Sequence, residues 1–346
     1  TACVAGNPLT DQPQIDRLGG TIVPPGCPHP MVTRVGSEAP GLPGTVVGAE
    51  PEVVQVHLGL VGDPRTSMVV SWRTTDDATT TGKVRFGLDA ALDQEAPGLT
   101  FTYAADFGNG AVIRVHEAHL CGLAADTAYS YQIESAPGVT SPTYQFRTAP
   151  DLALTPDAEV TIAAVGDSRD GYDVWAQIID QLIARTPDVI VFSGDAVTLG
   201  QQQREWDEFF IAAEPLFTRV PIVSVHGNHD INAPNYYAQL AMPGDEENYS
   251  FDYGAAHLVV ANDTPEQLAD LTGKTVQFLQ ADLAAHASAP WLIVNHHRPV
   301  YSASTRHGSD TTLRDTWAPV FDQAQVDVVL NGHDHDYERT KPMRAN

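Results

Sequence analysis

The sequence has few basic residues and no long apolar run, and each shortage excludes a class of protein. Among its 346 residues only 19 are Lys or Arg, against 44 Asp or Glu, which gives a formal net charge of -25 at pH 7. Nucleic acids and anionic membrane surfaces are bound by cationic faces, so we expect neither as a partner. Because no apolar run approaches the ~18 residues of a membrane-spanning helix, we expect no membrane span either.

Cysteine is also scarce, with Cys3, Cys27 and Cys121 as the complete set. None has a neighbour at the C-x-x-C spacing of a zinc knuckle. A disulfide between Cys3 and Cys27, with Cys121 left free, would suit an exported protein, and three reduced thiols are about as well supported. Thr1-Ala2-Cys3 also resembles the remnant of a bacterial lipoprotein cleavage site, which ranks lower because a complete signal segment is missing. We therefore expect a secreted or periplasmic protein and leave lipoprotein anchoring open.

Composition and periodicity divide the chain into three segments, and its length exceeds that of one average domain. Residues 1–50 are rich in proline and glycine, without a period, and predict an extended N-terminal extension. Residues 51–150 alternate apolar and polar residues in short runs, as at Val54 and Val56, and predict an all-β sandwich. Residues 151–346 alternate strand and helix patterns, which predict a layered α/β domain.

Two helices are expected in the α/β segment. Apolar residues recur at helical spacing over residues 174–183 and again over residues 313–324. Pro319 lies within the second stretch and would either kink that helix or start it.

Five short apolar runs of the α/β segment end in residues that can bind a metal. The residues that follow these runs are Gly166-Asp167, Gly194-Asp195, Gly227-Asn228-His229-Asp230, His296-His297 and Asn331-Gly332-His333-Asp334-His335. Taken singly, each has an ordinary explanation as a turn, a helix cap or a solvated side chain. Five such turns occur in chain order, each at the end of an expected strand. Together they favour metal binding at one edge of a sheet.

These residues resemble the motif series of the calcineurin-like metallophosphoesterases. The matching set is Asp167, Asp195, Asn228-His229-Asp230, His297-Arg298-Pro299 and Gly332-His333-Asp334-His335. The continuation Asp336-Tyr337-Glu338-Arg339 is closest to the purple acid phosphatase branch. The resemblance covers residues 158–339. It implies an α/β (α+β sandwich) metallophosphatase domain preceded by an all-β sandwich of fibronectin type III type.

The resemblance also implies a binuclear metal centre with six protein ligands. Asp195 would touch both metals; Asp167 and His335 would complete one site, and Asn228, His297 and His333 the other. Mixed carboxylate, amide and imidazole ligands suit iron, zinc or manganese and disfavour calcium or magnesium. His296 and His226 each adjoin a motif but fall outside the ligand pattern. His296 is expected either to support a metal ligand or to be packed, and His226 is expected to be structural.

The implied reaction is metal-dependent hydrolysis of small phosphate esters, with phosphomonoesters preferred, by a metal-bridged hydroxide. His229, oriented by Asp230, would donate a proton to a phosphate oxygen or to the leaving group. His307 is a second candidate proton donor, in the polar and Ser-rich loop of residues 302–309.

The chain departs from the family pattern at three places. Thr198 stands where purple acid phosphatases carry a tyrosine, so we predict no purple colour and a weaker preference for ferric iron. Arg169 replaces a glycine of the usual Gly-Asp-x-Gly turn and would contact substrate phosphate, or else pair with Asp170 or Asp173 at the surface. Only residues 340–346 follow the last motif, so either the fold closes with fewer strands or the chain is a fragment.

Other functions remain open at this point. A phosphodiesterase or nucleotide hydrolase would use the same residues, and the pocket wall, expected from Tyr236, Tyr237 and residues 302–310, would decide between them. A non-catalytic surface-binding module with an inactive phosphatase-like domain would fit Thr198 and the early chain end. A metal-storage or redox role is a weaker alternative. Oligomeric state does not follow from the sequence.

Overall fold

The computed structural model describes residues 21–32, 45–46, 51–76, 79, 82–104, 111–265 and 267–343. Most of the expected N-terminal extension, including Cys3, lies outside the described residues. Its described part contains β1 (Thr21–Ile22) and β2 (Met31–Val32), which pair with each other, and β3 (Thr45–Val46). Within the ranges given, no helix combines the length and the apolar character needed to cross a membrane.

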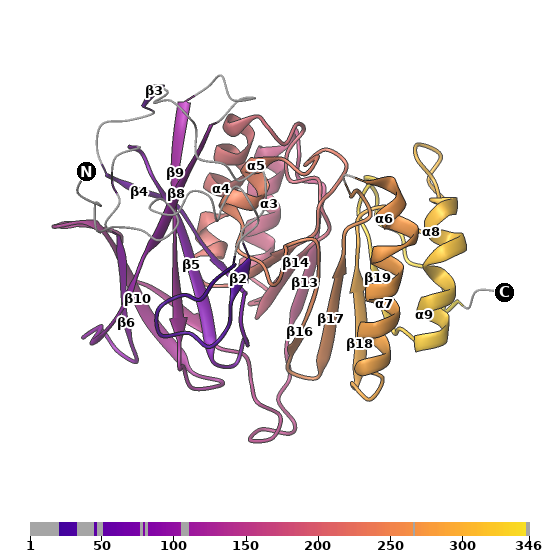
Figure 1. Ribbon diagram of the computed structural model, residues 1–346, viewed down its shortest axis with the longest axis horizontal. Helices are drawn as coiled ribbons and strands as arrows, with labels where there is room; N and C mark the ends of the chain where they lie inside the picture. Colours follow the sequence, from indigo (N-terminus) through magenta and orange to yellow (C-terminus); the bar gives the residue numbers. More distant parts are fainter. Residues whose placement is uncertain are drawn as a thin grey trace.

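The first large unit is a sandwich of two β-sheets, as predicted (Figure 1). One sheet has the order β3-β9-β5-β4 with β8 paired to β9, and the other has the order β11-β10-β6-β7 with β12 paired to β10. The strands are β4 (Val53–Gly59), β5 (Ser67–Thr74), β6 (Lys83–Gly87), β7 (Gln94–Pro97), β8 (Leu99–Ala104), β9 (Ala111–Cys121), β10 (Ala128–Ala136), β11 (Val139–Thr140) and β12 (Tyr144–Arg147). At the start of β10, the Tyr129 hydroxyl accepts the Ala124 N–H at 2.9 Å and fixes this corner.

The second unit is the predicted layered α/β domain. Its strands are β13 (Ile162–Val165), β14 (Val189–Phe192), β15 (Ile222–Ser224), β16 (Asn248–Tyr253), β17 (Ala256–Ala261), β18 (Trp291–Asn295) and β19 (Val328–Leu330). Its helices are α3 (Tyr172–Ile183), α4 (Gln203–Phe217), α5 (Pro234–Gln239), α6 (Leu268–Thr272), α7 (Lys274–Ala285), α8 (Thr311–Thr316) and α9 (Ala318–Ala324). Both expected helices are present. The second is divided into α8 and α9, and Pro319 stands in the first turn of α9, so it starts a helix.

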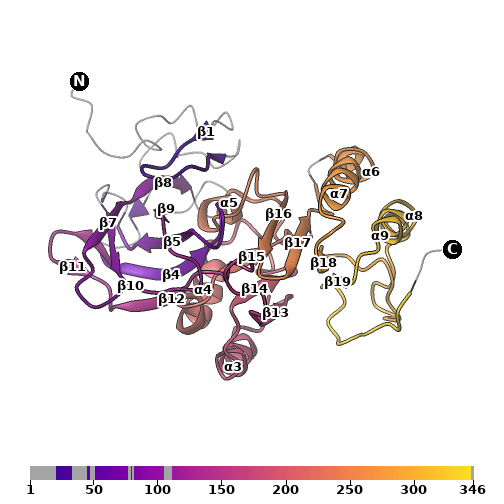
Figure 2. The ribbon, with the colours of Figure 1, turned by 90° about the horizontal axis from the view of Figure 1, so that it is seen from below.

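Two sheets lie side by side at the centre of this domain (Figures 1 and 2). The parallel sheet β13-β14-β15 faces α3 and α4, and the mixed sheet β16-β17-β18-β19 carries α6 to α9 on its outer side. The Asn295 amide joins the sheets, because it donates to the Phe192 carbonyl at 3.2 Å and accepts from the Ser193 hydroxyl at 3.1 Å. The C-terminal ends of six strands therefore meet at one edge of the domain.

The sandwich strands β4 and β5 are buried on both faces, which their alternating sequences do not predict. Arg73 on the outer face is 5% exposed, and its guanidinium donates to Asp207 of α4 at 2.8 Å. The His57 ring stacks on Phe210 of α4 with centroids 4.4 Å apart. Gln55 adopts φ 58° where the β4–β5 register shifts, so a bulge interrupts the period. Helix α4 thus covers the face that an isolated sandwich would leave in water.

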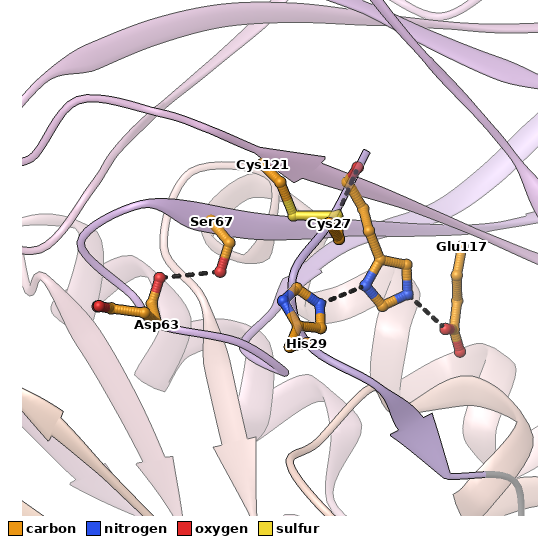
Figure 3. Close-up of a disulfide and its surroundings, with 7 residues drawn as sticks. Cys27, His29, Asp63, Ser67, Glu117 and Cys121 are labelled. Atoms are coloured by element: carbon orange, nitrogen blue, oxygen red, sulfur yellow. Dashed lines mark hydrogen bonds and ion pairs between the residues drawn. A yellow bond between two sulfur atoms is a disulfide. The ribbon is translucent and has the colours of Figure 1, made fainter. Parts of the chain in front are cut away.

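A disulfide joins Cys27 to Cys121 (Figure 3). The expectations of a Cys3–Cys27 bridge with a free Cys121, and of three reduced thiols, are therefore wrong. Cys121 is the last residue of β9, and its Cα lies 5.3 Å from that of Cys27, within the range of a disulfide. The two are separated by 94 residues in sequence, so only the folded topology brings them together. The bridge ties the described part of the N-terminal segment to the sandwich.

Candidate metal centre and active site

The turns after β13, β14, β15, β18 and β19 bring the expected ligands to one place. Asp167, Asp195 and His333 have φ values of 55°, 57° and 71°, a left-handed conformation that is uncommon outside glycine and clusters at functional sites. Glycines allow the close approach: a Cβ on Gly227 would lie 2.1 Å from Asp195 Oδ1, and one on Gly332 would lie 2.3 Å from Asp167 Oδ2. Contact with these two carboxylates therefore requires glycine directly before Asn228 and directly before His333.

Asp195, Asn228, His297 and His333 form one half of the cluster. His297 Nε2 lies 3.1 Å from Asn228 Oδ1, 3.3 Å from His333 Nδ1 and 3.4 Å from Asp195 Oδ1. The other ring nitrogen of His297 lies 2.7 Å from the Ser193 carbonyl, which orients the imidazole. Three of these residues, Asp195, His297 and His333, each place a donor atom within 4.8 Å of the others.

Asp167 and His335 form the other half. His335 Nε2 lies 3.5 Å from Asp167 Oδ1, and Asp167 Oδ2 accepts the backbone N–H of His333 at 2.9 Å. Asp167 Oδ1 is buried without a hydrogen-bond partner. Burial, with a contribution from the charge of Asp195, raises the pKa of Asp167 to about 6 against the opposing effect of His297. An oxygen that is both buried and unsatisfied is a position that a cation would fill.

Asp195 and His297 are a coupled pair at the bottom of the site, and both are fully buried. Burial acts to raise the pKa of Asp195, but the hydrogen bond and charge of His297, together with contributions from His229, outweigh that effect and lower the pKa to about 2. Burial acts to lower the pKa of His297, and Asp195 reverses this and raises it to about 9. Without a cation, the imidazolium thus compensates the carboxylate charge.

The donor set fits the two-cation centre that the sequence implies. Carboxylate, amide and imidazole groups converge within hydrogen-bond distances of one another, and the unsatisfied Asp167 oxygen lies among them. Mixed oxygen and nitrogen donors suit first-row transition metals and zinc. All six expected ligands lie in this cluster: Asp167, Asp195, Asn228, His297, His333 and His335.

Asp230 holds the loops of the centre together through their backbones. Its Oδ2 accepts the N–H groups of Asp195 and Gly227, both at 2.8 Å, and its Oδ1 accepts that of Ala196 at 3.0 Å. Burial, followed by the charge of Asp195, raises the pKa of Asp230 to about 7. The expectation that Asp230 orients the His229 imidazole is wrong, because its carboxylate accepts three backbone N–H groups and the ring nitrogen of His229 contacts the Thr198 carbonyl instead.

His229 is oriented by a carbonyl group. Its Nδ1 lies 2.7 Å from the oxygen of Thr198, and its backbone N–H donates to Asp195 Oδ1 at 2.9 Å. The Thr198 N–H in turn donates to the Glu205 carboxylate. Thr198, in the place of the family tyrosine, therefore contributes through its backbone to the position of His229.

Arg169 points into the cluster and does not pair with Asp170 or Asp173. Its Nε donates to Asp195 Oδ2 at 3.1 Å, and its Nη2 lies 3.3 Å from His335 Nε2. The Arg169 side chain is only 13% exposed. The surface-pair alternative is therefore wrong, and a cationic group faces the centre.

His307 lies at the open side of the cluster, with its ring centroid 4.2 Å from that of His333. The surrounding loop of residues 302–309 is anchored by the end of the described chain. Asp334 accepts the Ser302 hydroxyl at 2.6 Å, and Glu338 accepts the Ala303 N–H at 3.0 Å. Asp334 thus shapes the wall of the site.

The expectation that Tyr236 and Tyr237 line the pocket wall is wrong. They are 0% and 5% exposed, and both rings pack against His226, with centroids 3.6 and 4.8 Å away. His226 is buried in this aromatic cluster, as expected for a structural histidine. Of the expected wall, only the loop of residues 302–310 lies at the site, with His307 beside His333.

A separate cavity of about 610 Å³ lies between the N-terminal ends of α3 and α4. Acidic side chains dominate its lining, with Asp170, Asp173, Glu205 and Glu208 against the single cation Arg204. Such a lining repels phosphate, so this cavity is not the substrate site.

Asp263 was missed by the reasoning from sequence. It follows β17 and is fully buried, and it accepts the backbone N–H of Arg298 at 2.5 Å. Its Oδ2 also lies 3.2 Å from His296 Nδ1, so His296 faces Asp263 rather than the cluster. The apolar run of β17 ends in Asn262-Asp263, which is the same signal that marked the other five turns.

Each of the two units matches the model of a known protein family. The calcineurin-like phosphoesterase family matches residues 160–337, about half of the chain, and the purple acid phosphatase N-terminal domain matches residues 53–148. Purple acid phosphatase 22 of Arabidopsis thaliana is 30% identical over 312 residues, which cover 84% of this chain and 68% of that protein. Acid phosphatase type 7 of Homo sapiens is 30% identical over 331 residues, covering 85% and 72%.

The solved structure of purple acid phosphatase PPD1 from yellow lupin (Lupinus luteus) seeds has a similar fold. The TM-score is 0.69 at 20% sequence identity, over 82% of this chain. The chain spans 58% of the lupin protein. The fold class expected from the sequence is thereby confirmed: a β-sandwich followed by a metallophosphatase domain.

Proposed function

The chain belongs to the calcineurin-like phosphoesterase family, in the purple acid phosphatase branch of binuclear metallophosphoesterases, and from this premise we propose that it hydrolyses phosphate monoesters. The observation that supports this most strongly is the convergence of six donor side chains from five strand ends. We propose that these six side chains hold two cations, drawn from iron, zinc and manganese. When bound, such a pair lowers the pKa of a water molecule and offsets the charge of phosphate oxygens.

Arg169 is proposed to hold the phosphate group. Its guanidinium is partly buried and is already directed at the centre by Asp195. A planar guanidinium can bind two phosphate oxygens at once, and a monoester dianion gains more from this contact than a diester monoanion. The overall charge of -25 does not oppose this role, because the local charge at the site differs from the total.

His229 is proposed to donate a proton to the leaving-group oxygen. Its Nδ1 lies against the Thr198 carbonyl, so this nitrogen carries a hydrogen. A proton can therefore be given to substrate only from Nε2 of the imidazolium form, which leaves a neutral imidazole. His307 is a second candidate for the same role, placed beside His333 on the wall of the site. Proton donation makes the departing alkoxide a neutral alcohol.

The test is turnover of p-nitrophenyl phosphate and of bis(p-nitrophenyl) phosphate by the metal-loaded full chain. We expect the monoester to have the higher kcat/KM. A higher kcat/KM for the diester would show that the protein is a phosphodiesterase instead. If the chain binds no metal and turns over neither substrate, the protein is a non-catalytic binding module.

We also propose that the protein is exported. The Cys27–Cys121 disulfide supports an oxidising compartment, since such bonds persist in secreted and periplasmic proteins. Labelling of free thiols before reduction, in protein isolated from its native cells, tests this, and modified Cys27 or Cys121 would contradict it.

A further inference from the structure

Another group of side chains that can bind a metal lies at the opposite end of the mixed sheet. His257 is the second residue of β17, whereas the phosphoesterase centre lies beyond the C-terminal ends of the strands. Asp282 lies in the last turn of α7, and His286 is the residue at which that helix ends. No motif of the phosphoesterase series includes these three residues.

The three side chains converge on one point. His257 Nε2 lies 2.9 Å from Asp282 Oδ2, and His286 Nδ1 lies 3.6 Å from Asp282 Oδ1. The two imidazole rings stack with centroids 3.7 Å apart and an interplanar angle of 16°. One donor atom from each residue falls within 4.8 Å of the other two. Two imidazoles and one carboxylate are a common ligand set for zinc.

Neighbouring groups orient these ligands as they do in known metal sites. The second ring nitrogen of His257 lies 2.7 Å from Asp252 Oδ1, which would fix the ring while Nε2 faces the cation. The Ser250 hydroxyl donates to Asp282 Oδ1 at 2.6 Å, which holds the carboxylate in place. The side chains of His257 and Asp282 are 2% and 12% exposed, so the site is built into the fold.

The site is open on one side, because the side chain of His286 is 38% exposed. A hydrogen-bonded network without metal would need only protonated His257 between the carboxylates of Asp252 and Asp282. In such a network the His286 ring would contact only the Asp282 carbonyl, whereas a cation would make this ring, stacked on that of His257 at the same carboxylate, a third ligand. His286 Nδ1 lies 2.8 Å from the Asp282 carbonyl, so a modest ring movement exchanges that contact for a ligand bond.

We propose that His257, Asp282 and His286 bind one zinc ion, with water in the fourth position. The cation would join the end of α7 to the start of β17. It would lie outside the phosphoesterase centre and be independent of the proposed hydrolysis. Its role would be to stabilise this end of the domain.

The experiment is zinc uptake by the full chain after removal of metals with a chelator. The protein is dialysed against Zn²⁺ alone, and bound zinc is counted by elemental analysis. His286→Gln and Asp282→Asn should each bind one zinc fewer than the wild type and keep p-nitrophenyl phosphate turnover within about twofold. Gln280→Ala, an exposed position on the same helix, is the control and should bind the wild-type amount.

Two further measurements keep the outcomes separate. His333→Ala alters the proposed catalytic centre and should leave the His257 site occupied, so failure at one site is distinguishable from failure at the other. Anomalous diffraction from zinc-soaked crystals of the wild type should show a peak between His257 and Asp282, whatever the folding of the variants. Equal zinc in His286→Gln and the wild type, or no peak at this position, would overturn the proposal.

Discussion

Replacing Asp230 with asparagine should destabilise the phosphoesterase domain without changing the size of the side chain. The carboxylate accepts three buried backbone N–H groups, two at Oδ2 and one at Oδ1. Asparagine keeps one acceptor oxygen and turns an NH₂ group toward at least one of these donors. Above its pKa of about 7 the Asp230 carboxylate is ionised, and hydrogen bonds to charged groups contribute about 1.5–3 kcal/mol each. At a pH above this value, losing one and weakening two should lower the unfolding free energy by roughly 3–5 kcal/mol.

The same change should weaken metal binding, because Asp230 positions the loops that carry Asp195 and Asn228. Groups that support metal ligands typically contribute 10–100-fold in affinity. Urea unfolding followed by tryptophan fluorescence, with Trp175 and Trp206 buried in this domain, reports the stability, and dialysis against Zn²⁺ reports the affinity. Asp173→Asn, at an exposed position in the first turn of α3, is the matched control and should change stability by about 0.5 kcal/mol or less. Equal stability and metal content in Asp230→Asn and the wild type would refute the positioning role.

Three other predictions concern the sandwich, the disulfide and the substrate contact. In the folded chain, burial and then the charge of Arg114 lower the pKa of His116 to about 3. The pKa of this histidine in the unfolded chain is near 6.5, so between these two pH values the unfolded chain binds more protons than the folded one. Acidification through this window should therefore reduce stability by up to about 1.4 kcal/mol per pH unit, and His116→Gln should have a shallower pH dependence in urea unfolding; identical slopes would contradict this. Cys27→Ser should lower the unfolding free energy by about 2–4 kcal/mol, since the bridge closes a long loop, and reductant should do the same to the wild type but not to the variant. Arg169→Ala should reduce kcat/KM for p-nitrophenyl phosphate by about 10–100-fold, mainly through KM and with partial recovery in Arg169→Lys, whereas unchanged kinetics would exclude a substrate contact.

Local patterns predicted the elements and the cluster well, because both depend on short-range periodicity and on strand order. Each apolar run of the α/β domain became a strand, and parallel strands place their following residues at one edge. The six expected ligands meet there for that reason. Asp263 could have been found in the same way, since its position after β17 carries the same signal.

Long-range packing was not predictable from these patterns. The Cys27–Cys121 pairing depends on which strand lies beside the N-terminal segment, and sequence spacing does not specify this. Burial of both faces of β4 and β5 depends on the contact with α4, which comes from the other unit. Asp230 was assigned to its sequence neighbour His229, whereas its carboxylate binds backbone groups of two loops. Side-chain direction at a turn is decided by tertiary contacts that a motif does not contain.

The most direct test of the account is anomalous diffraction from crystals of the untreated full chain, collected at the iron, manganese and zinc absorption edges. Two peaks about 3.5–4 Å apart are expected among Asp167, Asp195, Asn228, His297, His333 and His335, with Asp195 in contact with both. No peak within this cluster, after metal has also been supplied, would contradict the proposed binuclear centre and with it the hydrolytic function.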